Sequence, residues 1–495
     1  MKVRYSTTPN GEKRTDQDLD QQWNSINWNE IKSQINRLQT RIAKATQERK
    51  WNLVKRLSYL LTHSHSAKLL AVWMVTQNQG KRTSGIDGEL WYTASEKMQA
   101  TLRLTDKQYH AQPLRRIYIP KPGKDTKRPI SIPTMYDRAM QTLYALALQP
   151  VAETTADPRS FGFRLFRCTQ DAAEYVFKCI RNKRSAQWIL EGDIWGCFDN
   201  ISHVWLRRNI PMDQSILSQF LKSGFIFDQR LFATDKGTPQ GGVVSPILAN
   251  MALDGIEKIL SERFPNMKVH YARFADDFIV TAPSKEIAEE IREHIQEFLE
   301  TRGLELSPEK TVISHIDEGF DFLGWNFRKY KGKLIIKPSR KSIDSIIQKI
   351  KTTTKKGQAW TQEDIIRVLN PVILGWTNYH RHNSASETFQ KLDNYLWINL
   401  LQWAKRRHPN KGHRWILKRY WHSVGNRKWV FRTDQNKLVK FSDADIRRHH
   451  MPKLNANPYL DRSYFIERKN RIIKRTPWIQ TRLSFFGFRR PTNGL

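Results

Sequence analysis

Two adjacent carboxylates in the second half of the chain are the first residues that could carry chemistry. The tetrapeptide FADD, Phe274–Asp277, lies between strand-like residues at Val269 and Tyr271 and the apolar run 278–280. Adjacent carboxylates at a hairpin tip repel each other unless a cation neutralises them. Mg²⁺ does so with oxygen ligands in octahedral geometry. Because Asp-Asp also occurs in ordinary turns, FADD alone is only a candidate metal site.

A second apolar segment brings another carboxylate to its end. The run Trp188–Asp193 (WILEGD) has the composition of a buried strand and is followed by Phe198. If this strand lies beside the FADD hairpin, Asp193 meets Asp276 and Asp277 at one edge of a sheet. Three carboxylates could hold two metal ions about 3.5–4 Å apart, the geometry that stabilises the attacking and leaving oxygens in phosphoryl transfer. We therefore expect a two-metal site here rather than separate solvated turns.

A glycine-rich segment separates the two acidic strands in sequence. Gly237–Asn250 reads GTPQGGVVSPILAN, and its glycines allow the backbone to approach a ligand closely. A helix is expected to begin near Ser245 and Pro246. Taken alone, the segment is weak evidence for a ligand site, and a plain loop is the favoured interpretation.

The elements around these motifs follow two patterns. Apolar residues recur at helical spacing from Ile31 to Leu61, whereas short strand-like runs mix with helices between residues 115 and 280. The middle of the chain is therefore predicted to be α+β, preceded by a helical region.

Beyond residue 337 the chain is predicted to be helical again. Thr361 and Asp364 have capping-box spacing, so a helix should begin there. Ser384 and Glu387 repeat that spacing and predict a second helix start. Together with the apolar spacing of Ile343–Ile350, they predict a small three-helix domain.

Charge is the dominant feature of the composition. The 495 residues include 83 Lys plus Arg against 48 Asp plus Glu, a formal net charge of +35. Hydrophobic residues make up 39%, which excludes a disordered polyelectrolyte. A basic balance of this size indicates a polyanionic partner, either nucleic acid or an acidic membrane surface.

Targeting and redox signals are few. The start MKVRYS is not that of a signal peptide, and no apolar stretch approaches the roughly 20 residues of a membrane span. Cys168, Cys179 and Cys197 form no CxxC pair, which argues against a disulfide scaffold and a structural zinc site. A reducing cytosol is the expected compartment.

The motifs, taken in order, resemble the group II intron-encoded reverse transcriptase/maturase family. The core set is Asp193 with Phe198-Asp199, then PQGG-x-x-SP, FADD, and Phe322–Trp325 (FLGW). Further motifs of the same family are SGIDG (Ser84–Gly88), IPKPGKDTKRPISIP (Ile119–Pro133), DRAMQ (Asp137–Gln141), SFGFR (Ser160–Arg164), LSPEKT (Leu306–Thr311) and LNPVILGWTNYHRH with its following Phe-x-x-Leu-Asp (Leu369–Asp393). The likeness covers about residues 25 to 410, and fades towards 465.

The resemblance implies an α+β right-hand polymerase, with an antiparallel sheet in fingers and palm, a helical thumb and a basic C-terminal appendage. It divides the chain into an N-terminal helical extension with the start of the fingers (1–110), fingers and palm (111–335), a maturase X domain or thumb (336–410) and a basic DNA-binding region (411–495). The implied function is RNA-directed DNA polymerase and intron maturase, which copies the intron by target-primed reverse transcription during retrohoming.

The resemblance also implies a metal and nucleotide site. Asp193 and Asp276 would ligate two Mg²⁺ ions with the Ile194 carbonyl, and Asp277 would complete the carboxylate set. Phe198 stands at the steric-gate position that excludes a 2′-hydroxyl, with a core phenylalanine as the alternative.

Four further side chains complete the implied site for the dNTP substrate. Lys121 and Arg128 would clasp its triphosphate, unless they belong to a plain solvated face, and Gln240 would lie beside it. Lys310 is a candidate general acid for the leaving pyrophosphate, with a solvated lysine equally compatible.

Two departures from the family pattern stand out. The family tetrad usually begins with Tyr, and Phe274 replaces it here. Many members end in a His-Asn-His endonuclease with cysteine pairs, but no cysteine follows Cys197. His449 and His450 lack metal-ligand spacing. We therefore expect no endonuclease, and expect these histidines to face solvent or RNA.

The C-terminal fifth is strongly basic. Residues 401–495 hold 24 Lys plus Arg and 5 Asp plus Glu, a net +19. Cations that neutralise phosphates and rings that stack on bases are typical of nucleic-acid binding, although Trp403 and Trp415 are expected to pack in a core. The residues predicted to contact nucleic acid are Arg406, Arg407, Lys411, Arg414, Lys418 and Arg419.

The expected partners are group II intron RNA, target DNA and an RNA template/DNA primer duplex, with no membrane, and whether the chain forms a homodimer stays open. The expected location is the bacterial cytoplasm, with the nucleoid as the place of action on DNA. Two alternatives remain. One is a stand-alone or CRISPR/defence-associated reverse transcriptase; the other is a splicing-only maturase, against which the intact Asp193, Asp276 and Asp277 speak.

Overall fold

The N-terminal part of the protein is helical, as its periodicity predicts. The computed structural model describes residues 15–120 and 126–475. Apolar residues such as Ile35 and Ile42 on the second helix are buried against α6 (Met135–Thr155), which is itself buried along most of its length. The helices of this region are α1 (Asp16–Asn24), α2 (Trp28–Gln47), α3 (Trp51–His63), α4 (His65–Gln77) and α5 (Ala94–Arg103).

The fingers contain a small mixed sheet in the strand order β2-β1-β4-β5. The first two strands form a hairpin that pairs Ile119 with Arg128, and β1 runs parallel to β4. The strands are β1 (Leu114–Pro120), β2 (Lys127–Ile132), β4 (Phe225–Phe227) and β5 (Arg230–Phe232).

The palm is an antiparallel sheet in the order β6-β7-β3-β8. Alternate residues of β3 face opposite layers: Leu190 lies in the large core that includes α13 (Lys285–Glu300), and Ile189 lies in a second core with α7 (Thr169–Ile180). The sheet is therefore buried on both faces. Its strands are β3 (Trp188–Asp193), β6 (His270–Phe274), β7 (Asp277–Ala282) and β8 (Val312–His315).

Short helices lie between β3 and β6 in the chain, and a second sheet follows β8. The helices are α8 (Cys197–Asn200), α9 (His203–Asn209), α10 (Gln214–Lys222), α11 (Ser245–Leu253) and α12 (Ile256–Arg263). The second sheet has the order β11-β10-β9, with β9 (Phe320–Phe322), β10 (Trp325–Tyr330) and β11 (Lys333–Pro338).

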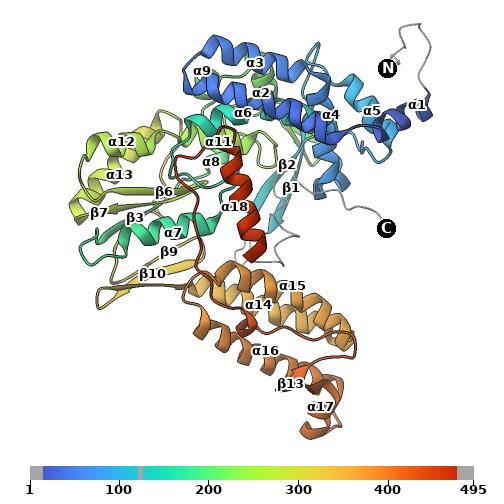
Figure 1. The fold of residues 1–495 in the computed structure, drawn as a ribbon, viewed down its shortest axis with the longest axis vertical. Coiled ribbons are helices and arrows are strands. Elements are labelled where there is room, and N and C mark those ends of the chain that lie inside the picture. The colour runs from blue at the N-terminus through green and yellow to red at the C-terminus, as the bar shows by residue number, and fades with distance from the viewer. Residues whose placement is uncertain (1–14, 121–125, 476–495) are drawn as a thin grey trace.

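The thumb projects from the palm on the side away from α1–α5 (Figure 1). Its three predicted helices are α14 (Arg340–Lys356), α15 (Gln362–His380) and α16 (Ser386–Arg407). The capping box of Thr361 and Asp364 is confirmed at the start of α15. The one predicted at Ser384 is wrong, because α16 begins at Ser386 without a side-chain cap.

The hydrophobic core of the thumb continues beyond residue 410. It includes Ile416, Phe431 and Phe441 from the elements α17 (His413–Tyr420), β12 (Trp421–Val424) and β13 (Arg427–Phe431) and the turn that follows. A boundary at 410/411 therefore divides one packed unit, and the sequence 411–444 belongs to the thumb.

The chain then returns to the palm and the N-terminal helices. α18 (Arg462–Arg475), red in Figure 1, lies beside the palm rather than extending the thumb. Its Phe465 is buried and stacks on Phe166, with ring centroids 5.1 Å apart, and the Tyr459 carbonyl accepts from Thr40 Oγ1 at 3.2 Å. Residues 445–475, which we call the C-terminal strap, thus run back across the molecule. This arrangement differs from the expected appendage. Within the two described ranges, no helix has both the length and the apolar character needed to cross a membrane.

Candidate active site

Three carboxylates meet where two central palm strands end. Asp193 is the last residue of β3 and is paired in register with Asp277, the first residue of β7. Asp276 occupies the turn between β6 and β7. The structure therefore brings together the two acidic strand ends, Asp193 and Asp277, that the sequence places 84 positions apart.

The turn that carries Asp276 is held by the SFGFR segment. Ala275 adopts a φ of +59°, which matches the positive φ that two-residue hairpin turns require. Gly162 lies so close that a Cβ there would come within 2.2 Å of the Ala275 nitrogen. Phe161 N also donates to the Arg273 carbonyl at 2.8 Å. Only glycine fits at position 162, because any side chain would push the turn away.

The carboxylates create a strongly acidic environment. Burial, followed by the charge of Asp193, raises the pKa of Asp276. Asp277 is open to solvent on one side, but burial on the others, together with Asp276 and Asp193, raises its pKa to about 6. Clustered oxygen ligands whose charges repel each other fit a hard divalent cation such as Mg²⁺.

Lys310 supplies a positive charge at this centre. Its Nζ donates to Asp193 Oδ1 at 2.7 Å, and 55% of its side chain is exposed. The same LSPEKT segment fixes the backbone of β3, because Ser307 N donates to the Asp193 carbonyl at 2.7 Å. Ile194, whose carbonyl was an expected ligand, is buried and bridged to Leu306.

A buried arginine beneath the turn was missed by the sequence reasoning. Arg273 is fully buried and donates to Asn250 Oδ1 at 3.0 Å and to Asp254 Oδ1 at 2.6 Å, and it also reaches the Ala275 carbonyl at 3.3 Å. Asn250 in turn donates to the Gly162 carbonyl at 2.8 Å. The available signal was a cation in the middle of the apolar strand KVHYARF.

The glycine-rich loop packs against α8, which follows Asp193 in the chain. Gly237 has a φ of +83° and touches the backbone of Phe198 and Asp199, and Thr238 N donates to the Phe198 carbonyl at 2.6 Å. Gln240 Nε2 donates to Asp199 Oδ2 at 3.1 Å, and its own carbonyl accepts from Ser131 N at 2.7 Å. The loop therefore links β2 to α8.

Phe198 and Arg128, two more of the predicted nucleotide-binding residues, lie on α8 and β2. Phe198 is half-buried, and the ring of Phe163 packs edge-on against it with centroids 6.0 Å apart. Arg128 is exposed on β2, and its charge counteracts the rise in the pKa of Asp276. Lys121 lies outside the described residues.

The cations predicted to bind nucleic acid differ in their exposure to solvent. Five of them are exposed on the thumb: Arg406, Lys411, Arg414, Lys418 and Arg419. Arg407 instead donates to the carbonyls of Gln358 at 2.8 Å and Trp360 at 2.7 Å, so it fastens the thumb core. Trp403 is buried as expected, whereas Trp415 is 40% exposed and its predicted core position is wrong.

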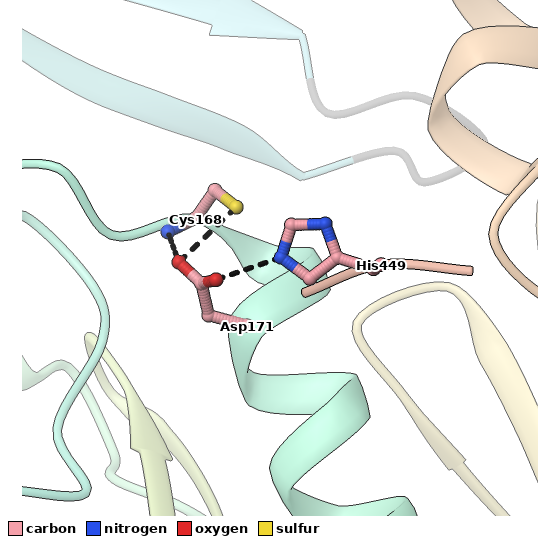
Figure 2. A group of neighbouring side chains, drawn as sticks. All are labelled: Cys168, Asp171 and His449. Carbon is pink, nitrogen blue, oxygen red and sulfur yellow. Dashed lines mark hydrogen bonds and ion pairs between the residues drawn. The ribbon is translucent and has the colours of Figure 1, made fainter. Parts of the chain in front are cut away.

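His449 is also placed differently from the expectation that it faces solvent or RNA. Figure 2 shows it with Cys168 around the carboxylate of Asp171, which is fully buried. Both oxygens of Asp171 accept hydrogen bonds: from His449 Nε2 at 2.7 Å, Arg468 at 2.8 Å, Cys168 N at 2.8 Å and Cys168 Sγ at 3.3 Å. Burial raises the pKa of the Cys168 thiol, which keeps it a donor. The cluster is a hydrogen-bonded junction that joins the C-terminal strap to α7.

Comparisons with known families cover all three parts of this architecture. Residues 119–327 match the family described as reverse transcriptase (RNA-dependent DNA polymerase). Residues 23–104 match the N-terminal domain of reverse transcriptase, and residues 343–421 match the group II intron maturase-specific domain.

Similar proteins of known name include the group II intron-encoded protein LtrA of Lactococcus lactis, 28% identical over 458 residues that span 72% of this chain and 75% of LtrA. Protein YkfC of Escherichia coli is 31% identical and covers 51% of this chain and 78% of YkfC. Maturase-like protein 1 of Euglena gracilis is 25% identical, with 66% and 70% coverage.

Among solved structures, telomerase from Candida albicans matches with 13% sequence identity and a TM-score of 0.37. The match covers 63% of this chain and 62% of the telomerase chain. The family matches and the relatives confirm the resemblance seen in the motifs. The chain belongs to the group II intron-encoded reverse transcriptase/maturase family, and is an RNA-directed DNA polymerase with intron maturase function.

Proposed function

We propose that Asp193, Asp276 and Asp277 hold two Mg²⁺ ions and that this centre adds dNTPs to a primer 3′ end. The proposal rests on one observation: Asp193 and Asp277 are opposed in register with Asp276 in the adjoining turn. The metal ions would supply charge that stabilises the attacking 3′-oxygen and the leaving pyrophosphate. The Ile194 carbonyl, next to Asp193, would be a further ligand.

The residues on the fingers side would bind and select the nucleotide. Arg128 has the bidentate guanidinium that suits phosphate oxygens, and Lys121 would share this role. Gln240 would support the nucleotide from the glycine-rich loop. Its hydrogen bond to Asp199 ties this loop to α8, close in sequence to Asp193. Phe198 would reject a 2′-hydroxyl with its half-buried ring, which lies on α8 five residues after Asp193.

Lys310 would serve as proton donor to the pyrophosphate. Its ammonium group is held at Asp193 and is more than half exposed, so it can leave this ion pair without crossing a packed core. When cations bind the carboxylates, their charge would free Lys310 to turn towards the leaving group.

The basic thumb and strap would hold the nucleic acids. Intron RNA and target DNA are the proposed partners, with the RNA template/DNA primer duplex in the palm, and target-primed reverse transcription in the bacterial cytoplasm and nucleoid is the proposed biological process. The exposed thumb cations support this assignment, because phosphate contacts dominate the affinity of such proteins.

Primer extension tests the site assignment. Asp276→Ala should abolish cDNA synthesis on a primed poly(A) template and leave the affinity for intron RNA near that of wild type. The matched control is Asp344→Ala, which removes an exposed carboxylate of the thumb and should leave synthesis unchanged. Full synthesis by the Asp276 variant would refute the assignment.

A further inference from the structure

The hairpin of β12 and β13 presents a tryptophan in an unusual setting. The strands pair His422 with Val430 and Val424 with Arg427, so two residues of β13 face one residue of β12. Trp429 lies in this bulge with a φ of +61° and is 54% exposed. A left-handed backbone is unfavourable for a bulky residue, and an exposed indole gains little from folding. Bulges re-aim side chains, and strain of this kind is retained where a function uses it.

Two cations directly precede this ring in the chain. Arg427 and Lys428 immediately precede Trp429 and are exposed. Arg427 also pairs with Asp443, which ties the hairpin to the segment that follows it. The hairpin therefore offers a ring and two cations within three consecutive residues.

A groove of about 890 Å³ adjoins the hairpin, between α15 and residues 432–447. Val424 at the end of β12 is part of its lining, so the groove begins where β12 ends. Its volume falls within the roughly 300–1,000 Å³ of small-ligand sites. Five cations line it against three aspartates: Arg381, Arg432, Lys437, Lys440 and Arg447.

An exposed ring beside cations suits one class of ligand. Cations neutralise phosphates, while a ring stacks on a base only if that base is unpaired. Duplex DNA keeps its bases stacked inside the helix, whereas the loops and bulges of folded RNA splay bases outwards. The hairpin also directly follows the maturase-specific match, which ends at residue 421.

We propose that the Trp429 hairpin and the adjoining groove bind an unpaired nucleotide of structured RNA. Trp429 stacks on the base, and Lys428 and Lys440 contact the flanking phosphates. This inference rests on the proposed role of intron RNA as a partner, and it names the chemical feature of that RNA which the thumb recognises.

The test uses the full chain and a hairpin RNA with one unpaired 2-aminopurine in a bulge. Binding is followed by anisotropy, and stacking by quenching of the 2-aminopurine. Trp429→Ala should lower the affinity about tenfold and abolish most of the quenching, because each stacked base contributes substantially to binding. Trp429→Phe should keep most of both signals. Trp51→Ala, which removes another exposed indole far from the thumb, is the matched control.

Each outcome is decisive. If Trp429→Ala binds like wild type, or if Trp429→Phe is as defective as the alanine variant, the stacking site is wrong, while intron RNA remains a partner. If a single-stranded DNA of the same sequence binds and quenches equally well, the assignment to RNA is wrong. If wild-type protein fails to bind this hairpin RNA but binds its co-transcribed intron RNA, the stacking site is wrong; if it binds neither, the proposed RNA partner itself is refuted. Circular dichroism of each variant verifies that its fold is intact.

Discussion

At the scale of single residues, the proposed site assigns the choice between deoxyribose and ribose to the ring of Phe198. We predict that Phe198→Val admits rNTPs, because the smaller side chain no longer occupies the space of a 2′-hydroxyl. Phe163→Ala should act in the same direction but more weakly, since Phe163 touches Phe198 rather than the nucleotide. The ratio of kcat/KM for dNTP and rNTP measures both effects. Unchanged discrimination in the Phe198 variant would place the gate elsewhere.

Arg273 is the residue on which the acidic turn depends for stability. Arg273→Met leaves Asp254 buried without its cation, and breaking a buried ion pair costs about 3–5 kcal/mol. We therefore expect a fall of that order in the free energy of unfolding, measured by urea denaturation. Lys285→Gln, which breaks an exposed pair with Glu289, should cost less than about 1 kcal/mol. Equal losses in the two variants would contradict a structural role for Arg273.

Residue types and spacing were sufficient to predict that the three carboxylates meet, because an apolar run that ends in aspartate can be recognised from a few neighbouring residues. They were insufficient for His449, whose partner Asp171 lies 278 positions away. Arg273 of β6 was missed for a related reason. The partners that stabilise its buried charge are Asn250 on α11 and Asp254 at the C-terminal end of that helix, about 20 residues earlier in the chain.

At the scale of elements, local signals succeeded where no tertiary contact competed with them. Thr361 caps α15 as its spacing predicts. Ser384 does not cap α16, because its backbone nitrogen donates to the Ile336 carbonyl of β11 at 2.9 Å. Trp415 is partly exposed because α17 turns Ile416 and Tyr420 towards the core instead.

A buried histidine at the joint between palm and thumb should make the protein less stable at low pH. Trp325 of β10 stacks on Tyr379 of α15 with centroids 4.5 Å apart, and beside them burial lowers the pKa of His380 to about 3. An unfolded histidine titrates near 6.5. Between pH 6.5 and about 3 the unfolded chain therefore binds a proton that the folded chain does not, so stability falls as the pH falls.

This effect is measurable with a variant that cannot titrate. The loss approaches about 1.4 kcal/mol per pH unit for one such group. Wild-type protein should thus lose more stability than His380→Gln between pH 7 and pH 5 in urea denaturation. Identical pH dependence would mean that His380 binds a proton as readily in the folded protein as in the unfolded chain.

At the scale of the whole molecule, the C-terminal strap joins parts that are distant in sequence. Asp171 holds both His449 and Arg468, and Asn457 Nδ2 donates to Thr154 Oγ1 at 2.9 Å. We predict that Asp171→Asn loosens residues 445–461 and speeds their cleavage in limited proteolysis. Arg471→Ala, on the exposed side of α18, is the control and should leave the rate unchanged. Equal rates for wild type and Asp171→Asn would contradict this role.

Charge alone predicted that the molecule binds a polyanion, but it could not predict how the basic part is folded. Residues 411–444 complete the thumb core, and residues 445–475 return to the palm. Both arrangements depend on contacts between residues distant in sequence, and the sequence of this region has only weak helical or strand periodicity. Deleting residues 411–495 therefore removes core side chains such as Phe431 and Phe441. For this reason point substitutions are better probes of this region than truncation.

The central claim is that Asp193, Asp276 and Asp277 form one two-metal centre. Its most direct test counts Mn²⁺ ions, as a spectroscopic substitute for Mg²⁺, in the full chain bound to a dideoxy-terminated primer, template and incoming dNTP. Electron paramagnetic resonance should find two tightly bound ions per chain in wild type and a loss of tight binding in Asp276→Asn. Two tightly bound ions in that variant would show that the metals, and the chemistry, lie elsewhere.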